Sequence, residues 1–353
     1  MLDSSAKELK ALSASRVKTL ENCSWLYWCN YHLRLPQEKN EGAKKGDICH
    51  SIFELMVMKN RRSYFDKIVL HDSVTACPSI ERLIKLYIKK CGLQGASEGF
   101  LHIDKMILVG LKNDFYIKGG KMVAPEYKFD FVNDNGTFRL KGLMDKPVII
   151  GRRVMIDDYK SSKKKFSGED QESNLQALFY SYAAKKLWPG LKPVVRFIFL
   201  QYPEDPLMEV SFSDDALLGF ELYLEATQQK VSGFNESASK LNFAFDHPAV
   251  KDEFKGKSLC GFASFPGKLK RDGTKMWHCP YRFGYDYYAV EKDNKIVYCV
   301  FSLEEVRPLQ QGETVKKCHY AGCPKHINPM DDLQTSISKS EPRKVYGNVL
   351  DDF

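Results

Sequence analysis

The sequence has no apolar run long enough to cross a membrane. Its most apolar windows, residues 194–200 and 296–301, are far shorter than the ~20 residues that a spanning helix needs. The first residues also lack the apolar core of a secretory signal, so we expect a cytoplasmic protein with no membrane partner. In that reducing compartment the ten cysteines are expected to be thiols or metal ligands rather than disulfides.

Other absences narrow the class of protein. No internal repeat is visible, and there is no Gly-x-x-x-x-Gly-Lys-Ser/Thr loop, which argues against a P-loop motor. With 43% hydrophobic and 28% charged residues, the composition is that of an ordinary globular protein and excludes collagenous, low-complexity and fully disordered classes. The 53 Lys and Arg exceed the 45 Asp and Glu by eight, a balance that is compatible with a polyanionic partner without requiring one.

The predicted elements change in type along the chain. Helical spacing of apolar residues is typical of 1–35, 47–58 and 80–91, with a polar connector at 37–46. Alternation and turn residues predict antiparallel strands at 127–132, 137–145, 147–150 and 154–156. A helix at 174–187, a buried strand at 194–201 and a helix at 214–231 follow them. This order predicts an α/β (α+β) fold in which helices flank a central mixed sheet.

Five regions follow from this order. We expect an N-terminal helical part (1–60), a helical insertion (61–126), a core (127–250), a loop-rich C-terminal subdomain (251–327) and a polar, disordered tail (328–353). One further hairpin is predicted near residues 292–295 in the C-terminal subdomain.

Two acidic residues and a lysine are the strongest candidates for chemistry. Asp158 and Lys160 share one face of a predicted strand, and Asp145 lies on the neighbouring hairpin strand. The tight turn at 151–153 can bring Asp145 close to Asp158. Paired carboxylates are hard oxygen ligands for Mg²⁺ or Mn²⁺, and an adjacent lysine can orient water or neutralise an anionic transition state. An Asp-x-Lys by itself is more often a solvated surface pair.

Two helices supply the context for this trio. His50 and Glu54 are four residues apart and share a face of the helix at 47–58, and Gln176 and Tyr180 do the same on the helix at 174–187. Without that context, His50 is a buried helix histidine, Glu54 an ordinary helix glutamate, and Tyr180 part of a packing face.

Taken in order, these segments resemble a known family. The series Gly46…His50…Glu54, Gly142-Leu-Met-Asp145, Ile156-Asp-Asp-Tyr-Lys160 and Gln176-Ala-Leu-Phe-Tyr180 is similar to the motifs of the PD-(D/E)XK nuclease superfamily. Within it, the series resembles the branch of the RecB and AddB nuclease domains and the CRISPR-adaptation exonucleases. The resemblance covers about residues 15–205, with a weaker echo to about 285, and implies a restriction-endonuclease-like core within 127–250.

The resemblance also implies roles for single residues. The metal ligands would be Asp145, Asp158, the Tyr159 backbone carbonyl and His50, with Mg²⁺ or Mn²⁺ as the ion. Lys160 would position or activate water, and Glu54 would support the site. Gln176 and Tyr180 would face the DNA backbone or buttress the site. After Lys160, Lys163 and Lys164 suit a phosphate track, which Arg152 could join from the adjacent turn, although a solvated loop explains these lysines equally well.

The cysteines depart from the family pattern. Many nucleases of this branch hold an iron–sulfur cluster with one N-terminal cysteine and three clustered C-terminal ones. Cys23 and Cys279 match parts of that pattern, but the other spacings do not, so we expect no such cluster. Cys318 and Cys323, followed by His326, have the character of half a zinc site that would need a partner such as Cys260 or Cys279, and free loop cysteines are the simpler interpretation.

The leading hypothesis is a metal-dependent DNA nuclease. The branch favours an exonuclease acting on DNA ends or single strands in recombination, repair or replication. The alternative is a DNA-binding or adaptor protein on a degenerate nuclease fold, and RNA is a third, unsupported substrate. The acidic end at 350–353 resembles tails that recruit replication or recombination proteins.

Overall fold

The computed structural model describes residues 9–58, 61–93, 95–166, 174–244, 260, 265, 267–271, 273 and 276–326. The chain divides into two compact units. Unit 1 contains Met1–Lys18 and Glu38–Phe234, and unit 2 contains Thr19–Gln37 and Asn235–Phe353. The predicted tail at 328–353 lies outside the described residues, and the predicted region boundaries stay predictions.

The described helices form three groups along the chain. They are α1 Ala14–Asn22 and α2 Ser24–Tyr31; α3 Glu41–Val57, α4 Arg62–His71, α5 Pro78–Lys90 and α6 Ala96–Lys112; and α8 Leu175–Leu187, α9 Asp214–Ser232 and α10 Glu236–Ser239, with short 3₁₀ turns η3 Val74–Ala76 and η4 Leu303–Glu305. None of them combines the length and the apolarity needed to cross a bilayer.

Two helix boundaries differ from the sequence prediction. The helical segment expected over 1–35 is broken at Cys23, whose backbone is extended (φ −167°, ψ 116°). The connector expected at 37–46 is already helical from Glu41, because the Asn40 side chain accepts a hydrogen bond from the Ala43 amide and so caps α3. Polar composition therefore concealed the first turns of this helix.

The central sheet of unit 1 is mixed, as predicted. Its strands are β1 Lys121–Met122, β4 Lys146–Ile150, β5 Arg153–Lys160, β6 Lys192–Phe199 and β7 Leu207–Val210, in the order β1-β4-β5-β6-β7. Of the four described strand pairs in this sheet, β5–β6 is parallel and the other three are antiparallel. The hairpin of β2 Tyr127–Val132 and β3 Arg139–Met144 precedes β4 in the chain. This is the restriction-endonuclease-like core that the sequence predicts.

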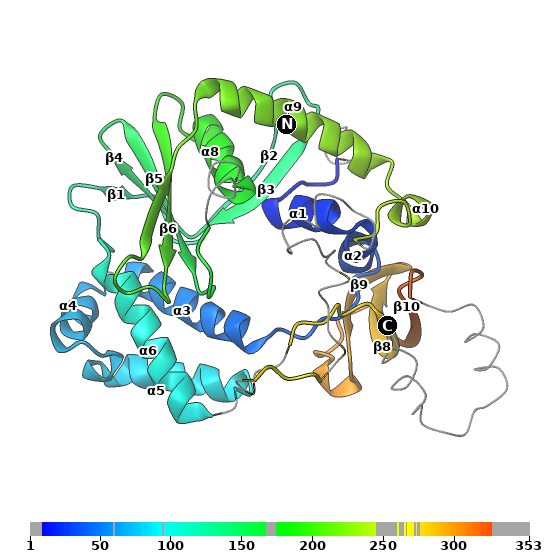
Figure 1. Ribbon diagram of the computed structural model, residues 1–353, viewed down its shortest axis with the longest axis horizontal. Helices are drawn as coiled ribbons and strands as arrows, with labels where there is room; N and C mark the ends of the chain where they lie inside the picture. The colour runs from blue at the N-terminus through cyan, green and yellow to red at the C-terminus, as the bar shows by residue number, and fades with distance from the viewer. Residues whose placement is uncertain are drawn as a thin grey trace. The chain divides into compact units, whose positions relative to one another are not determined.

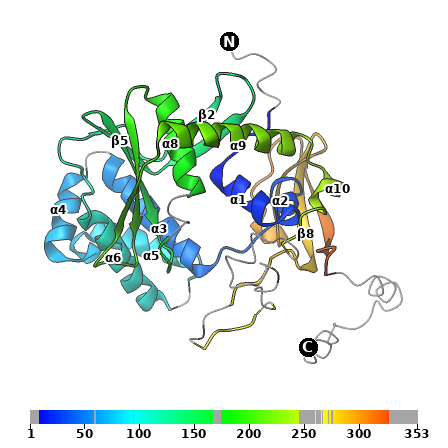
Figure 2. The ribbon, with the colours of Figure 1, turned by 45° about the horizontal axis from the view of Figure 1, so that its top comes forward.

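Helices flank this sheet (Figure 1). α8 contacts β6 and packs against α9, as Figure 2 also shows. α3, α4, α5 and α6 pack on one another, and α6 also contacts β6. Their shared apolar core includes Ile52, Ile84 and Ile107 and reaches Tyr159 of β5. The end of β5 is thus anchored in a helical layer, which fixes the position of the residues around it.

Unit 2 contains a sheet where we expect mainly loops. β8 Phe283–Lys292 pairs with β9 Lys295–Val300 and β10 Glu313–Gly322, all antiparallel. The β8–β9 turn is the hairpin predicted at 292–295, and Asp293 and Asn294 adopt the positive φ that such a two-residue turn needs. Aromatic residues alternate with polar ones along β8, a strand signal that the scattered turn residues masked.

Candidate active site

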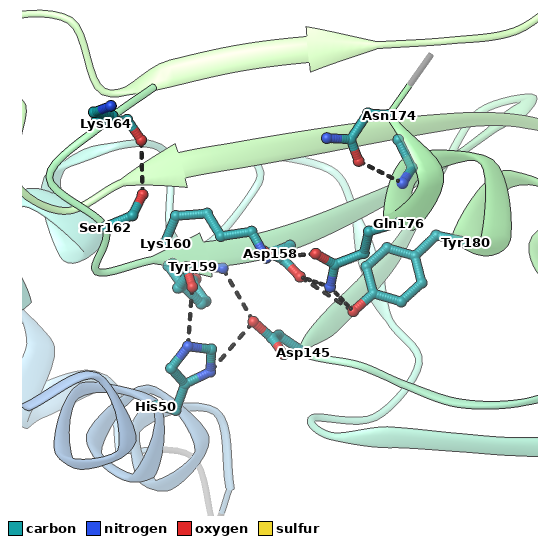
Figure 3. Close-up of polar contacts among 11 residues, drawn as sticks. His50, Asp145, Asp158, Tyr159, Lys160, Ser162, Lys164, Asn174, Gln176 and Tyr180 are labelled. Carbon is teal, nitrogen blue, oxygen red and sulfur yellow. Dashed lines mark hydrogen bonds and ion pairs between the residues drawn. The ribbon is translucent and has the colours of Figure 1, made fainter. Parts of the chain in front are cut away.

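The candidate site lies where α3 faces the ends of β3 and β5, as Figure 3 shows. Asp145 stands between β3 and β4, and Lys146 at the start of β4 pairs in register with Asp157 of β5. Continuing this register by one position would place Asp145 opposite Asp158. The short β4–β5 turn therefore brings the two carboxylates together, as the spacing around residues 151–153 suggested.

One group of contacts joins His50, Asp145 and the backbone of Tyr159. Asp145 Oδ2 accepts a hydrogen bond of 3.0 Å from the Tyr159 amide. His50 Nδ1 lies 3.3 Å from the same Asp145 oxygen, and His50 Nε2 lies 3.0 Å from the Tyr159 carbonyl oxygen. Three of the four metal ligands implied by the resemblance thus already contact one another.

A second group surrounds Asp158. Gln176 Nε2 donates to Asp158 Oδ1 at 2.8 Å, and Tyr180 Oη donates to the same oxygen at 3.1 Å. Lys160 Nζ donates to Gln176 Oε1 at 2.6 Å. Gln176 therefore links the carboxylate to the lysine, and both α8 residues buttress the site rather than stand apart from it.

The other oxygen of Asp158 lacks a hydrogen bond. Asp158 Oδ2 is buried and, within the described part of the chain, no donor reaches it with hydrogen-bond geometry. Lys160 Nζ lies 2.6 Å away as an ion-pair partner. A buried carboxylate is costly unless a cation balances it, and Lys160 supplies one such positive charge. With the neighbouring oxygen and imidazole donors, it suits a divalent metal such as Mg²⁺ or Mn²⁺.

Glu126, which immediately precedes β2, joins the candidate site although no sequence motif marks it. One ligand atom each of His50, Glu126 and Asp145 lies within 4.8 Å of the other two, so these residues could hold a metal ion together. The Glu126 amide donates to the Asp145 carbonyl at 2.8 Å, which extends the β2–β3 ladder by one position. Glu126 has a φ of +48°, uncommon for a residue with a side chain. The observed β2–β3 register, continued by one position, places it opposite Asp145.

Burial sets the electrostatics of these acids. Burial and the nearby Asp158 charge raise the pKa of the Asp145 carboxyl to about 7, although His50 opposes the rise. Burial also raises the pKa of Glu126, and His50 again opposes it. Glu54 lines the same pocket as His50 and Glu126, one helical turn beyond His50 on α3. The site gathers negative charge that a bound cation would stabilise.

A model of the PD-(D/E)XK nuclease superfamily matches residues 11–242, well over half of the chain. The chain belongs to the PD-(D/E)XK nuclease superfamily. This confirms the resemblance at the level of the superfamily, whereas the RecB and AddB branch stays a prediction. A solved structure from Eubacterium rectale, named "Putative exonuclease", is similar at 13% sequence identity and a TM-score of 0.42, over 72% of this chain and 96% of that chain. No curated protein matches the sequence.

A row of buried charges adjoins the candidate site along β4 and β5. Lys146 Nζ lies 2.7 Å from Asp157 Oδ2 and donates to the Phe115 carbonyl at 2.6 Å. Arg196 donates to both oxygens of Asp157, at 2.6 and 2.9 Å. Lys146 immediately follows Asp145 in the chain, and Asp157 immediately precedes Asp158. The row therefore ties β4, β5 and β6 together beneath the site.

The structure separates the predicted phosphate-binding residues. Lys163 and Lys164 are exposed on the loop after β5, next to the end of the strand that carries Lys160. Arg152 lies in the turn before β5, and Asp158 is six positions further along the chain, about 20 Å of extended strand. The geometry does not support the expectation that Arg152 joins the lysine track.

Seven of the described cysteines of unit 2 belong to or pack against one buried cluster: Cys23, Cys29, Cys260, Cys279, Cys299, Cys318 and Cys323. Burial raises the pKa of the Cys279 and Cys323 thiols to about 12, and Cys23 and Cys260 add to both shifts. The set predicted from the sequence, Cys23, Cys279, Cys318 and Cys323, stays a prediction.

Proposed function

We propose that this superfamily member is a divalent-metal-dependent deoxyribonuclease that hydrolyses phosphodiester bonds. The observation that carries the proposal is the convergence of His50, Asp145 and the Tyr159 carbonyl with Asp158 and Lys160. His50, Asp145, Asp158, Glu126 and the Tyr159 carbonyl would hold the ion. When bound, such an ion lowers the pKa of water and stabilises charge on the phosphate.

The chain's own residues contribute positioning and charge. Lys160 presents an ammonium group beside Asp158, where it can orient the attacking water and neutralise negative charge on the phosphate. Gln176 accepts from Lys160 and donates to Asp158, so it fixes both groups at once. Tyr180 is buried and donates to Asp158, which leaves this carboxylate little freedom to rotate.

The mode of cleavage, the DNA substrate and the pathway are inferred from the resemblance to the RecB and AddB branch. We infer an exonuclease that acts on DNA ends or single strands in recombination, repair or replication. The adaptor alternative predicts the loss of at least one site residue, whereas Asp145, Asp158 and Lys160 are all present with mutual contacts through Tyr159 and Gln176. Recruitment of a replication protein by residues 350–353 falls outside the described residues and stays a prediction.

The test uses 5′- and 3′-labelled DNA, single- and double-stranded, linear and circular. The purified protein is incubated with Mg²⁺, Mn²⁺ or EDTA, next to the Asp158→Asn variant. We expect cleavage of linear DNA that needs the metal and is lost in the variant, and the label pattern gives the polarity. Cleavage of circles would replace the exonuclease assignment by an endonuclease one. DNA binding without cleavage under any metal would favour the adaptor.

The cysteines of unit 2 raise the question whether the protein binds an iron–sulfur cluster. If an iron–sulfur cluster is assembled, we propose that Cys23, Cys260, Cys279 and Cys323 hold it. A single zinc ion is a poorer fit. Thiolates that bind one zinc ion at ~2.3 Å lie ~3.8 Å apart, whereas within the described residues no three of these sulfurs lie within 4.8 Å of one another. Iron and sulfide analysis of anaerobically purified protein, with Cys318→Ser as the matched control for Cys279→Ser, decides the matter. Absence of iron in the wild type would reject the cluster.

A further inference from the structure

The loop after β5, residues 161–165, is held in place by side chains of the connection between β6 and β7. Gln201 Nε2 donates to the Ser161 carbonyl at 2.5 Å, and Tyr202 Oη donates to the Lys163 carbonyl at 2.6 Å. Both acceptors belong to the backbone, so these contacts fix the course of the loop without engaging the Lys163 side chain.

The far end of this loop is fixed as well. Lys165 Nζ lies 2.6 Å from Asp205 Oδ2, and the same ammonium group lies 5.5 Å from the centroid of the Tyr202 ring. Ser162 Oγ donates to the Lys164 carbonyl at 2.8 Å, as Figure 3 shows. The loop therefore has a defined shape before any ligand binds.

Two lysines of the loop keep their charge available. Lys163 and Lys164 are both exposed. In the part of the chain that the structure describes, no carboxylate oxygen lies within 4.0 Å of either ammonium group, whereas Lys165 is paired with Asp205. Lysines that carry such uncompensated charge bind the phosphate groups of nucleic acids, because binding releases the counterions of the phosphates.

Two contacts place this loop at the border of the candidate site. It follows directly on Lys160, and Lys163 lies at most ~11 Å of chain beyond that residue. α3 touches the first loop residue, since a Cβ on Gly46 would lie 2.5 Å from Ser161 Oγ. Gly46 is about one helical turn before His50 on α3. A DNA strand bound at the candidate metal ligands therefore has these lysines within reach of its neighbouring phosphate groups.

We propose that residues 161–165 form a preformed phosphate-binding loop. Lys163 and Lys164 bind phosphate groups of the DNA strand next to the bond that is cut, and Gln201 and Tyr202 are positioning residues that hold the loop in shape. A loop that is ordered before binding loses less conformational entropy when the strand binds. The proposal rests on the proposed function. It goes beyond the sequence, which leaves a solvated loop equally open and marks neither positioning residue with a motif.

The experiment measures binding of a fluorescein-labelled single-stranded oligonucleotide in EDTA, over a range of salt concentrations. Lys163→Ala/Lys164→Ala should weaken binding about tenfold and reduce the slope of log affinity against log salt by about 0.7 per lysine. The matched control is Arg152→Ala/Lys192→Ala, which removes the same charge from exposed residues at the opposite end of β5 and β6. The control should change the affinity less than about twofold, because salt screens charges at that distance.

Tyr202→Phe tests the positioning role separately. The variant keeps the ring that Lys165 contacts and removes the hydroxyl that holds the Lys163 carbonyl. Both lysine charges remain, so the salt slope should keep its wild-type value while the affinity falls about threefold. Thermal unfolding of each variant checks that it is folded. Wild-type affinity in the folded Tyr202→Phe variant would overturn the positioning role.

The outcomes for the loop and for the nuclease are distinct. Wild-type affinity and salt slope in the Lys163→Ala/Lys164→Ala variant, or equal losses in this variant and its control, would overturn the phosphate-binding loop even if the wild type cleaves DNA. Conversely, a protein that shows the expected binding losses but cleaves no DNA with any metal would overturn the proposed function and keep the loop.

Discussion

At the scale of single residues, Asp145 is a carboxyl group whose charge the fold controls. It is largely buried, lies beside Asp158, and its carboxyl has a pKa raised to about 7. Asp145, Asp158, Lys160 and His50 could all be identified from sequence, because their order along the chain matches a motif series. Glu126 could not, since it belongs to no motif and reaches the site only through the register of one hairpin.

The raised pKa of Asp145 predicts a pH-dependent metal effect on stability. Asp145 binds a proton more readily in the folded than in the unfolded protein, so its protonation stabilises the metal-free fold. This stabilisation is lost as pH rises from about 4 through about 7. A divalent ion binds the ionised form. The rise in unfolding temperature on adding Mg²⁺ should therefore be larger at pH 8 than at pH 5.5, as measured by calorimetry.

The control for this prediction is Asp145→Asn, which cannot ionise. Its unfolding temperature should respond little to Mg²⁺ at either pH. A wild type that gains the same stability from Mg²⁺ at both pH values would contradict the role of Asp145.

Gln176 gives a second prediction at this scale. Gln176→Ala removes the acceptor of Lys160 and a donor to Asp158. We expect kcat to fall about 10- to 100-fold with little change in KM for DNA, because the variant disturbs groups that support the metal and water rather than the strand. Steady-state kinetics measures this, with Gln229→Ala on the exposed face of α9 as the control. A rise in KM at unchanged kcat would instead assign Gln176 to DNA contact.

At the scale of elements, the sheet positions the site through its buried row of charges. Sequence periodicity predicted the strands and the β4–β5 turn, and therefore the meeting of the two carboxylates. It did not predict the row of Lys146, Asp157 and Arg196, because charged residues within a strand are ordinarily assigned to a solvated face. Only the register of three neighbouring strands shows that these charges neutralise one another.

This row predicts a large loss of stability for Lys146→Met. The change leaves Asp157 buried with one cationic partner fewer, which costs about 3 kcal/mol in the free energy of unfolding. Urea denaturation measures the loss, and Lys121→Met on exposed β1 should cost less than about 0.5 kcal/mol. Equal effects of the two substitutions would show that the row adds no net stability.

At the scale of the whole molecule, the N-terminal segment Thr19–Gln37 belongs to the same unit as the C-terminal residues. Trp25 Nε1 donates to Tyr320 Oη at 2.7 Å, and Tyr320 donates to the Tyr281 carbonyl at 2.9 Å. No local sequence pattern predicts contacts between residues almost 300 positions apart. The sequence accordingly indicated the core of unit 1 far better than the sheet of unit 2.

Tyr320→Phe tests this long-range connection. Removing the hydroxyl leaves the buried Trp25 Nε1 without its acceptor, which should lower the unfolding free energy by about 1–3 kcal/mol. Trp fluorescence during urea denaturation follows the change, and Tyr288→Phe in β8 is the matched control. Unfolding of unit 2 at the wild-type urea concentration would show that this contact is dispensable.

The central claim is that the paired carboxylates form a metal-dependent nuclease centre. The most direct measurement is the initial rate of cleavage of labelled linear DNA against Mg²⁺ concentration, for the wild type and Asp158→Asn in parallel. We predict saturable, EDTA-sensitive cleavage by the wild type and a rate at least ~100-fold lower in the folded variant. Equal rates in the two proteins, or cleavage that persists in EDTA, would contradict the account.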